Sequence, residues 1–133
     1  MTHTHPVRVY YEDTDLAGIV YYANYLKFIE RGRSEWVRRR GVDQVALKAE
    51  QGIVFAVRKV DADYLKPARF DDLLEVRTEL VALGGARIDL RQEVWRGDGL
   101  LFTAAVTLVC LHDTGQPARL PPEVRAALTA GAD

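Results

Sequence analysis

The sequence predicts an α+β fold in which a five-stranded antiparallel sheet wraps around one long central helix. Between residues 23 and 40, apolar side chains recur every three or four positions, which is the spacing of a helix with one buried face. From residue 53 onward the pattern changes to alternating apolar and polar residues, which is typical of half-buried strands. One long helix and a run of strands bury their apolar faces against each other, so we expect a single domain over residues 1–133.

The N-terminal part of the chain is predicted to contain one strand and two helices. The strand covers residues 7–11, and residues 1–6 are expected to form a flexible tail. The long helix carries Gly32 on its apolar stripe, which costs about 1 kcal/mol of helix propensity relative to alanine. We therefore expect another element to pack closely against Gly32. Asp43 is predicted to cap the N-terminus of a two-turn helix that ends at Gly52.

The rest of the chain is predicted to be mostly strand, over residues 54–64, 73–83, 86–95 and 100–111. Short glycine-containing segments, Gly84-Gly85 and Gly97-Asp98-Gly99, are typical of hairpin turns between these strands. The last strand is apolar on both faces, which predicts a central or doubly covered position. Residues 113–133 are expected to form a tail with a short helix from Glu123. Because such a sheet has open edges, we expect a homodimer or homotetramer.

The composition is that of an ordinary soluble globular protein. Apolar residues make up 48 %, charged residues 28 %, and the net charge is −1, so no nucleic acid or other polyelectrolyte partner is indicated. No apolar run approaches the roughly 20 residues of a membrane span, and the N-terminus lacks the apolar core of a signal peptide. The single cysteine, Cys110, cannot form an intramolecular disulfide, which fits a reducing compartment. We therefore expect a cytoplasmic protein.

Several kinds of catalytic site are disfavoured by what the chain lacks. Ser34 is the only serine, and a Ser-His-Asp triad would need a distant histidine to reach it, so a solvated helix serine is favoured. Cys110 and His112 share one face of a predicted strand, but a core thiol beside a strand-end histidine is the favoured interpretation. His3 and His5 resemble a metal-binding pair without a third or fourth ligand, so no metal is expected.

Phosphate binding is open to two interpretations. The glycine pairs lie between strands and not before a helix, so they do not form a dinucleotide or nucleotide loop, and no cofactor is predicted. A basic cluster on the long helix is either a solvated face that complements the helix dipole or a site for a phosphate-bearing ligand. Its members are Arg31, Arg33, Arg38, Arg39 and Arg40.

The carboxylates Glu12, Asp13 and Asp15 crowd together just before the long helix. A helix N-terminus presents free backbone N–H groups and the positive end of the helix dipole. A carboxylate beside these donors can attack a carbonyl, or direct water at it, while the donors hold the carbonyl oxygen. Helix capping and Asx-turns use the same residue types, so spacing alone leaves both interpretations open.

Two long segments resemble a known family. They are VRVYYEDTDLAGIVYYANYLKFIERGRSEW, from residue 7, and FAVRKVDADYLKPARFDDLLEVRTEL, from residue 55. The DTDxxGxVxYxNY pattern and the ERxRSE helix are similar to those of acyl-CoA thioesterases of the hotdog superfamily. The resemblance is strongest to the Tol-Pal-associated (YbgC) type and extends to the 4-hydroxybenzoyl-CoA thioesterases. It implies a hotdog fold and an acyl-CoA or acyl-carrier-protein substrate, with coenzyme A as part of the substrate and no separate cofactor.

The resemblance also implies roles for individual residues. Asp15 matches the catalytic carboxylate, which acts either as a general base on water or as a nucleophile, and the backbone N–H of Tyr22 matches the donor to the thioester carbonyl. So sparse a site is chemically sufficient, because the leaving thiol has a pKa near the ~8.5 of cysteine and needs no strong acid.

The remaining matched positions are implied to bind or shape the substrate site. Gly18 forms the turn of the motif, and Asn24 and Tyr25 match positions that shape the helix start. Arg58 and Lys59 match a basic pair that we place along the coenzyme A path.

One departure from the family pattern bears on the substrate. Tyr22 stands where the Tol-Pal-associated type often has a histidine, and an aromatic residue occurs there in the benzoyl-CoA branch. We expect an aliphatic acyl-CoA, with an aromatic acyl-CoA as the alternative. A non-catalytic acyl-binding module is a further alternative. A dehydratase on the same fold is disfavoured, because the long helix has no histidine.

Overall fold

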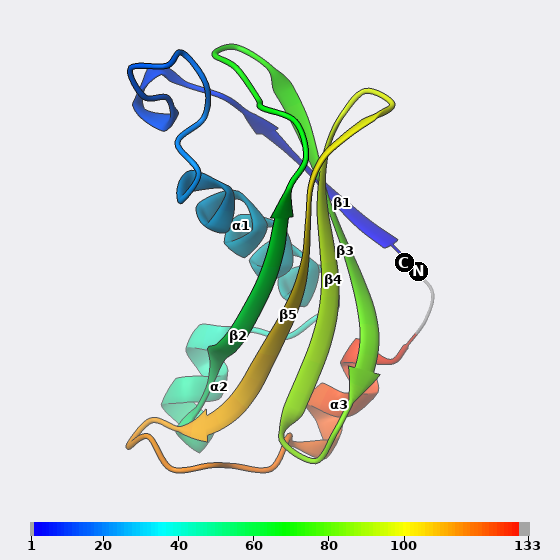
Figure 1. Cartoon of the computed structure of the whole chain (residues 1–133). Coiled ribbons are helices and arrows are strands. Elements are labelled where there is room, and N and C mark those ends of the chain that lie inside the picture. The colour runs from blue at the N-terminus through cyan, green and yellow to red at the C-terminus, as the bar shows by residue number, and fades with distance from the viewer. Residues whose placement is uncertain (1, 131–133) are drawn as a thin grey trace.

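The computed structural model describes residues 2–130. Its strands are β1 (Thr2–Arg8), β2 (Ile53–Tyr64), β3 (Leu73–Leu83), β4 (Arg87–Arg96) and β5 (Gly99–His112). Its helices are α1 (Asn24–Arg39), α2 (Gln44–Gln51) and α3 (Pro122–Leu128), with a short 3₁₀ helix, η1, at Tyr11–Asp13. The strands form one antiparallel sheet in the order β1-β3-β4-β5-β2 (Figure 1). The predicted α+β fold is confirmed.

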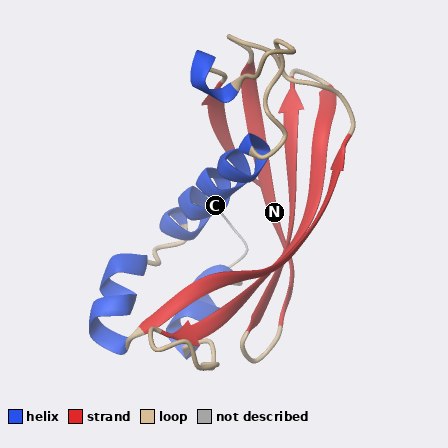
Figure 2. Ribbon diagram, turned by 60° about the vertical axis from the view of Figure 1, so that its left-hand side comes forward, coloured by secondary structure: helices blue, strands red, loops and turns tan. Residues whose placement is uncertain are grey.

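The sheet curves around α1, which lies along its inner face (Figure 2). The predicted apolar stripe of this helix is buried, including Phe28, Ile29 and Trp36. A Cβ added to Gly32 would overlap Cγ1 of Val76 and lie 3.1 Å from its Cβ. The expected close neighbour of Gly32 is therefore β3, and the missing side chain lets the helix axis approach the sheet.

The second helix and the strands β2 to β5 agree with their predicted positions to within about two residues. The Asp43 side chain accepts a hydrogen bond from the N–H of Ala46 at 3.0 Å, which caps α2, and Gly52 ends that helix with a left-handed backbone (φ +65°). The doubly apolar strand, β5, lies between β4 and β2, as its composition predicted.

The prediction for the first strand and the flexible tail was wrong. Residues 2–6 belong to β1, which pairs with β3 from Thr2 opposite Glu79 to Arg8 opposite Leu73. This strand ends at Arg8 instead of residue 11, because the chain turns into η1. The THTHP sequence has no apolar alternation of its own, so its strand depends on the hydrogen bonds that β3 offers at the sheet edge. Residue 1 lies outside the described residues.

The C-terminal segment contains the predicted short helix and covers one end of the sheet. Leu120, Val124 and Leu128 are buried, and the N–H of Leu120 donates to the carbonyl of Gly85 at 2.8 Å. The tail therefore contributes to the core around the β3–β4 turn. Residues 131–133 of the predicted tail lie outside the described residues.

Candidate active site

The loop between β1 and α1, residues 9–23, carries the clustered carboxylates and closes on itself. Thr14 and Val20 form an isolated antiparallel bridge, and the N–H of Asp15 donates to the carbonyl of Ile19 at 3.0 Å. The N–H of Gly18 donates to the carbonyl of Asp15 at 2.9 Å. Gly18 has φ +80°, a left-handed conformation that glycine adopts without strain, so the turn depends on this residue.

Asp15 opens this turn and is exposed to solvent. Its Oδ1 accepts a hydrogen bond from the N–H of Ala17 at 2.9 Å, as in an Asx-turn. None of the described residues donates to its Oδ2. The structural and chemical interpretations of this carboxylate are therefore compatible, since one oxygen holds the turn and the other is available to water or substrate.

Asp13, two residues earlier, has a different environment. Its side chain is buried, and Oδ2 accepts from the N–H of Tyr10 at 2.8 Å. Its main-chain carbonyl accepts from the N–H of Tyr21 and from Nδ2 of Asn24, each at 2.9 Å. Asp13 and the buried Asn24 thus tie the loop to the first turn of α1, while Glu12 is exposed.

The start of α1 leaves two backbone donors without an acceptor. The carbonyls of Tyr21, Tyr22 and Ala23 accept from Asn24, Tyr25 and Leu26 at 2.8, 3.4 and 3.1 Å. No described residue accepts from the N–H groups of Tyr22 or Ala23. These two donors lie at the positive end of a 16-residue helix, where a carbonyl oxygen that develops negative charge is stabilised.

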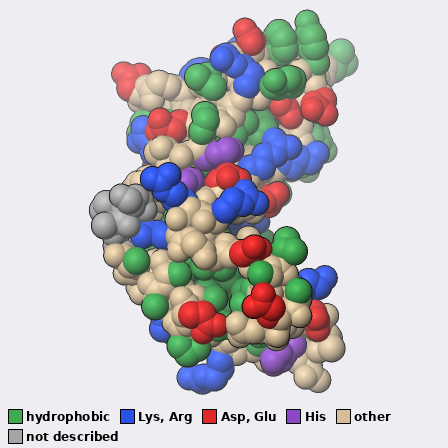
Figure 3. All heavy atoms as spheres, turned by 180° about the vertical axis from the view of Figure 1, so that it is seen from behind, with side chains coloured by type: hydrophobic (Ala, Val, Ile, Leu, Met, Phe, Trp, Pro, Cys, Tyr) green, Lys and Arg blue, Asp and Glu red, His purple; other side chains and the backbone are tan. Residues whose placement is uncertain are grey.

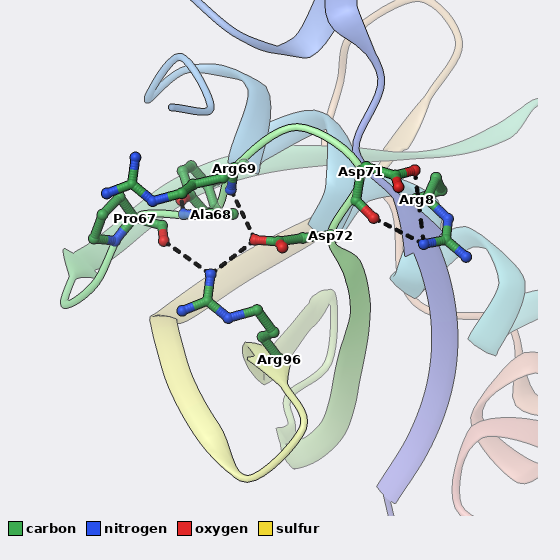
Figure 4. A network of polar contacts seen from close by, with 8 residues as sticks. Arg8, Pro67, Ala68, Arg69, Asp71, Asp72 and Arg96 are labelled. Atoms are coloured by element: carbon green, nitrogen blue, oxygen red, sulfur yellow. Dashed lines mark hydrogen bonds and ion pairs between the residues drawn. The ribbon is translucent and has the colours of Figure 1, made fainter. Parts of the chain in front are cut away.

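A second loop, residues 65–72, packs beside the first one and is held by Arg96 (Figure 4). The Arg96 guanidinium donates to Oδ2 of Asp72 at 2.7 Å and to the carbonyl of Pro67 at 3.3 Å. The same Asp72 oxygen accepts from the N–H of Arg69 at 2.8 Å. Partial desolvation opposes ionisation of Asp72, but these hydrogen bonds and the Arg96 charge hold its pKa below the usual range.

Tyr25 joins this second loop to the core. Its ring is 3 % exposed and stacks on Phe102, with centroids 5.2 Å apart. Its hydroxyl oxygen accepts from the N–H of Ala68 at 2.9 Å, and the Ala68 carbonyl accepts from the N–H of Val20 at 2.9 Å. Burial raises the pKa of Tyr25. Tyr25 therefore supports both loops from the core side, and its ring is not part of the exposed site surface.

Tyr64, the last residue of β2, also reaches the helix start, although no pattern in the sequence singled it out as a site residue. Its hydroxyl donates to the carbonyl of Tyr22 at 3.0 Å. Its ring makes edge contacts with Tyr22 and Phe102, at centroid distances of 6.1 and 5.0 Å. The only sequence signal was its place in the DADYLKP part of the second family-like segment.

Apolar side chains gather on the surface at this end of the molecule (Figure 3, upper right). Tyr22 is 62 % exposed, and Leu16 at the tip of the Asp15 turn is fully exposed. Tyr11 stacks on Phe70 with centroids 4.2 Å apart, and both rings are exposed. The candidate site is therefore an open, partly aromatic surface around the exposed carboxylate of Asp15.

Arg58 and Lys59 are not brought into contact with this loop. They are exposed on β2, at an irregularity in its pairing with β5 between Val57 and Lys59. The basic residue beside the Asp15 turn is Arg69, whose backbone bridges Ile19. A coenzyme A path along Arg58 and Lys59 stays a prediction.

The structure also shows the surroundings of the residues considered for the disfavoured cysteine, serine and metal sites. Cys110 is fully buried in β5, and burial raises the pKa of its thiol to about 11, which opposes formation of a reactive thiolate. Ser34 donates to Glu30 at 2.5 Å along the surface of α1. Over residues 2–130, no group of three or more His, Cys, Asp or Glu side chains is placed to hold a metal ion. No helix in that range is long and apolar enough to cross a membrane.

Comparison with known proteins agrees with this architecture. The sequence pattern of the thioesterase superfamily matches residues 17–103. The acyl-CoA thioesterase YbgC of Haemophilus influenzae is 44 % identical over 124 residues, 92 % of this chain and 90 % of that protein. The acyl-CoA thioester hydrolase YbgC of Escherichia coli is 42 % identical over 123 residues, 91 % of each chain.

A solved structure supports the fold independently. The crystal structure of a probable thioesterase from Bartonella henselae superposes with a TM-score of 0.87 at 38 % identity, covering 91 % of this chain and all of that chain. The predicted hotdog fold is confirmed by this match, the sheet order and the central helix. The chain belongs to the thioesterase superfamily and is a thioester hydrolase.

Proposed function

We propose that this protein hydrolyses acyl-CoA thioesters to a free acid and coenzyme A, with Asp15 as the catalytic carboxylate. One observation carries the proposal: an exposed carboxylate with a free oxygen lies on the same closed loop as the two unpaired N–H groups at the start of α1. Thioester hydrolysis needs these two components, a group that delivers the nucleophile and donors for the carbonyl oxygen. The named activity of the H. influenzae and E. coli relatives points to the same reaction.

In the proposed reaction the thioester carbonyl oxygen accepts hydrogen bonds at the N-terminus of α1, from Tyr22 foremost. Asp15 either removes a proton from water as it adds to the carbonyl carbon or adds to that carbon itself. The tetrahedral intermediate expels the thiolate of coenzyme A as the C–S bond breaks. If Asp15 is the nucleophile, water then hydrolyses the acyl-aspartate anhydride. The thiolate is a good leaving group, because its pKa is near the ~8.5 of a cysteine thiol.

An aliphatic acyl group is the first candidate substrate, and an aromatic acyl group is the second. The aromatic group is kept as a candidate because the exposed rings of Tyr22 and Tyr64 meet edge to face beside the helix start, with centroids 6.1 Å apart. Rings in this position can pack against a planar acyl group. An acyl carrier protein is a further possible source of the thioester.

The test is thiol release from short aliphatic, long aliphatic and benzoyl-type acyl-CoAs by the native protein and by Asp15→Asn. We expect the variant to fold and to lose about 10²- to 10⁴-fold in turnover, because the amide cannot act as a base or nucleophile. The matched control is Glu12→Gln, which neutralises an exposed neighbouring carboxylate and should leave turnover unchanged.

The possible outcomes separate the alternatives. Near-native turnover by Asp15→Asn would rule out this mechanism. Tight binding of acyl-CoA by the native protein without release of thiol from any acyl-CoA or acyl carrier protein would instead indicate a binding module. The best donor in the panel identifies the acyl class.

A further inference from the structure

We propose that Tyr64 is a positioning residue of the oxyanion site, whose hydroxyl orients the peptide unit between Tyr22 and Ala23 so that the Ala23 N–H serves as a second donor to the thioester oxygen. This inference rests on the proposed thioesterase function. It gives the Ala23 N–H, the second of the two unpaired donors, a defined role and adds a supporting side chain to the site.

The N–H groups of Tyr22 and Ala23, at the start of α1, have no acceptor among the described residues. Each belongs to a planar peptide unit, in which the carbonyl and the N–H point in opposite directions. The unit with the Tyr22 N–H is held through the carbonyl of Tyr21, which accepts from the N–H of Asn24 at 2.8 Å. The unit with the Ala23 N–H is held through the carbonyl of Tyr22. Whatever fixes the Tyr22 carbonyl therefore fixes the direction of the Ala23 donor.

The helix itself holds the Tyr22 carbonyl only weakly. The N–H of Tyr25 approaches it at 3.4 Å, well beyond the usual 2.9–3.0 Å of a backbone hydrogen bond. The Tyr64 hydroxyl, which arrives from the end of β2, makes the shorter contact at 3.0 Å. The principal restraint on this peptide unit therefore comes from a strand 42 residues away in sequence.

Tyr64 is itself held in place on several sides. Its ring meets Tyr25 and Phe102 edge to face, with centroid distances of 5.4 and 5.0 Å. Both partners are buried in the core, whereas Tyr64 is 46 % exposed at the site surface. Desolvation and the neighbouring Tyr22 and Tyr25 raise the pKa of Tyr64, so its hydroxyl remains a donor at neutral pH.

Two consequences for catalysis follow from this geometry. A fixed Ala23 N–H needs no reorientation when negative charge develops on the thioester oxygen. A hydrogen bond to the Tyr22 carbonyl also polarises the peptide unit and strengthens the N–H at its other end. Both effects are larger in the transition state than in the ground state, so they raise kcat more than they lower KM.

The test is Tyr64→Phe, which keeps the aromatic ring and removes only the hydroxyl. We expect kcat to fall about 10-fold with KM within about 2-fold of native, less than the 10²- to 10³-fold cost of removing a whole oxyanion donor. Tyr10→Phe is the matched control, because it removes the hydroxyl and keeps the ring of an exposed tyrosine that takes no part in the proposed site. It should have native kcat and KM.

A second measurement reports on the peptide unit without relying on turnover. In amide NMR spectra of Tyr64→Phe, the Ala23 resonance should shift and its exchange with solvent should change, while the amides of β4 keep their native positions. An unchanged Ala23 amide, or a native kcat, would overturn the role of Tyr64. A rise in KM at constant kcat would also overturn it, since that result indicates ground-state binding.

The failure of this inference differs from the failure of the proposed function. If the native protein releases thiol and Tyr64→Phe is equally fast, only the positioning role is disproved. If the native protein releases no thiol from any donor, the proposed function is disproved, and the oxyanion role of Ala23 is disproved with it.

Discussion

At the residue scale, two neighbouring aspartates show how position determines role. Asp13 is buried, and both its side chain and its carbonyl are occupied by backbone and Asn24 donors. Asp15 is exposed and has one oxygen engaged in its own turn. The same functional group therefore supports the loop at one position and is free for chemistry two residues later.

A third aspartate, Asp72, predicts a pH dependence of stability. Its folded-state pKa is lowered by hydrogen bonds from Arg69 and Arg96, relative to about 3.9 for an unfolded aspartate. The stabilisation is thus fully present above the unfolded pKa and is lost as the pH falls through the folded pKa. Because both partners are partly exposed, we expect Asp72→Asn to lower the free energy of unfolding by about 1 kcal/mol at pH 7.

Urea denaturation of native protein and Asp72→Asn at pH 7 and at pH 3 checks this prediction. The difference between the two proteins should shrink at the lower pH. Asp61→Asn is the control, because none of the described residues forms an ion pair with Asp61, and it should match the native protein at both values. A difference that is equal at both pH values would contradict the electrostatic explanation.

At the element scale, the contact between α1 and the sheet sets the position of the whole helix and therefore of its N-terminus. Gly32 lies against Val76 and close to Thr78. The buried Gln92 side chain donates from Nε2 to the carbonyl of Ile29 at 2.8 Å and to Oγ1 of Thr78 at 2.9 Å. Close packing and a polar anchor together restrict sliding of α1 over the sheet.

Gly32→Ala should destabilise the protein even though alanine is the better helix former. Overpacking against Val76 is expected to cost about 1–3 kcal/mol, which exceeds the gain of about 1 kcal/mol in helix propensity. The free energy of unfolding from urea titration measures the net effect. In the double variant Gly32→Ala with Val76→Ala, the added methyl group occupies vacated space, so the loss should be smaller than the sum of the two single losses. Strict additivity would show that the two residues do not compete for this space.

At the scale of the whole molecule, the sheet has two open edges, β1 and β2. The 12-residue β2 edge is the longer one, and a small cavity of about 180 Å³ lies between it and α1. Val57, which lines this cavity, is 47 % exposed. Open strand edges with exposed apolar residues tend to pair with another chain.

We predict that the protein is a homodimer or homotetramer and that the β2 edge forms the first interface. Light scattering on the protein as it elutes from a size-exclusion column should give a mass two or four times the 15.0 kDa of one chain. Val57→Glu should lower that mass, because it buries a charge in the expected interface. Val81→Glu changes a similarly exposed valine on β3 and should leave the mass unchanged. A native protein with the mass of one chain would contradict the prediction.

Local patterns were sufficient for most of the elements. The 3.6-residue period of α1, the alternation of β2 to β5 and the Asp43 cap each depend on residues close together in sequence, so they could be predicted without a tertiary structure. The first strand could not, because residues 2–6 carry no strand pattern and become a strand only beside β3. The family, in contrast, could be recognised from the sequence, because the resemblance includes a continuous segment around Asp15.

The sequence by itself determined the fold class, the order of the elements and the loop that holds the candidate site, since these follow from local periodicity and contiguous motifs. Only the tertiary structure decided which groups in that loop are free. Asp13 is occupied because its side chain accepts from Tyr10 and its carbonyl accepts from Asn24 of α1, whereas Asp15 has one oxygen engaged, by Ala17 of its own turn. Tyr64 reaches the Tyr22 carbonyl because the curvature of the sheet brings the end of β2 to the helix start, a contact between residues 42 apart that no local pattern encodes.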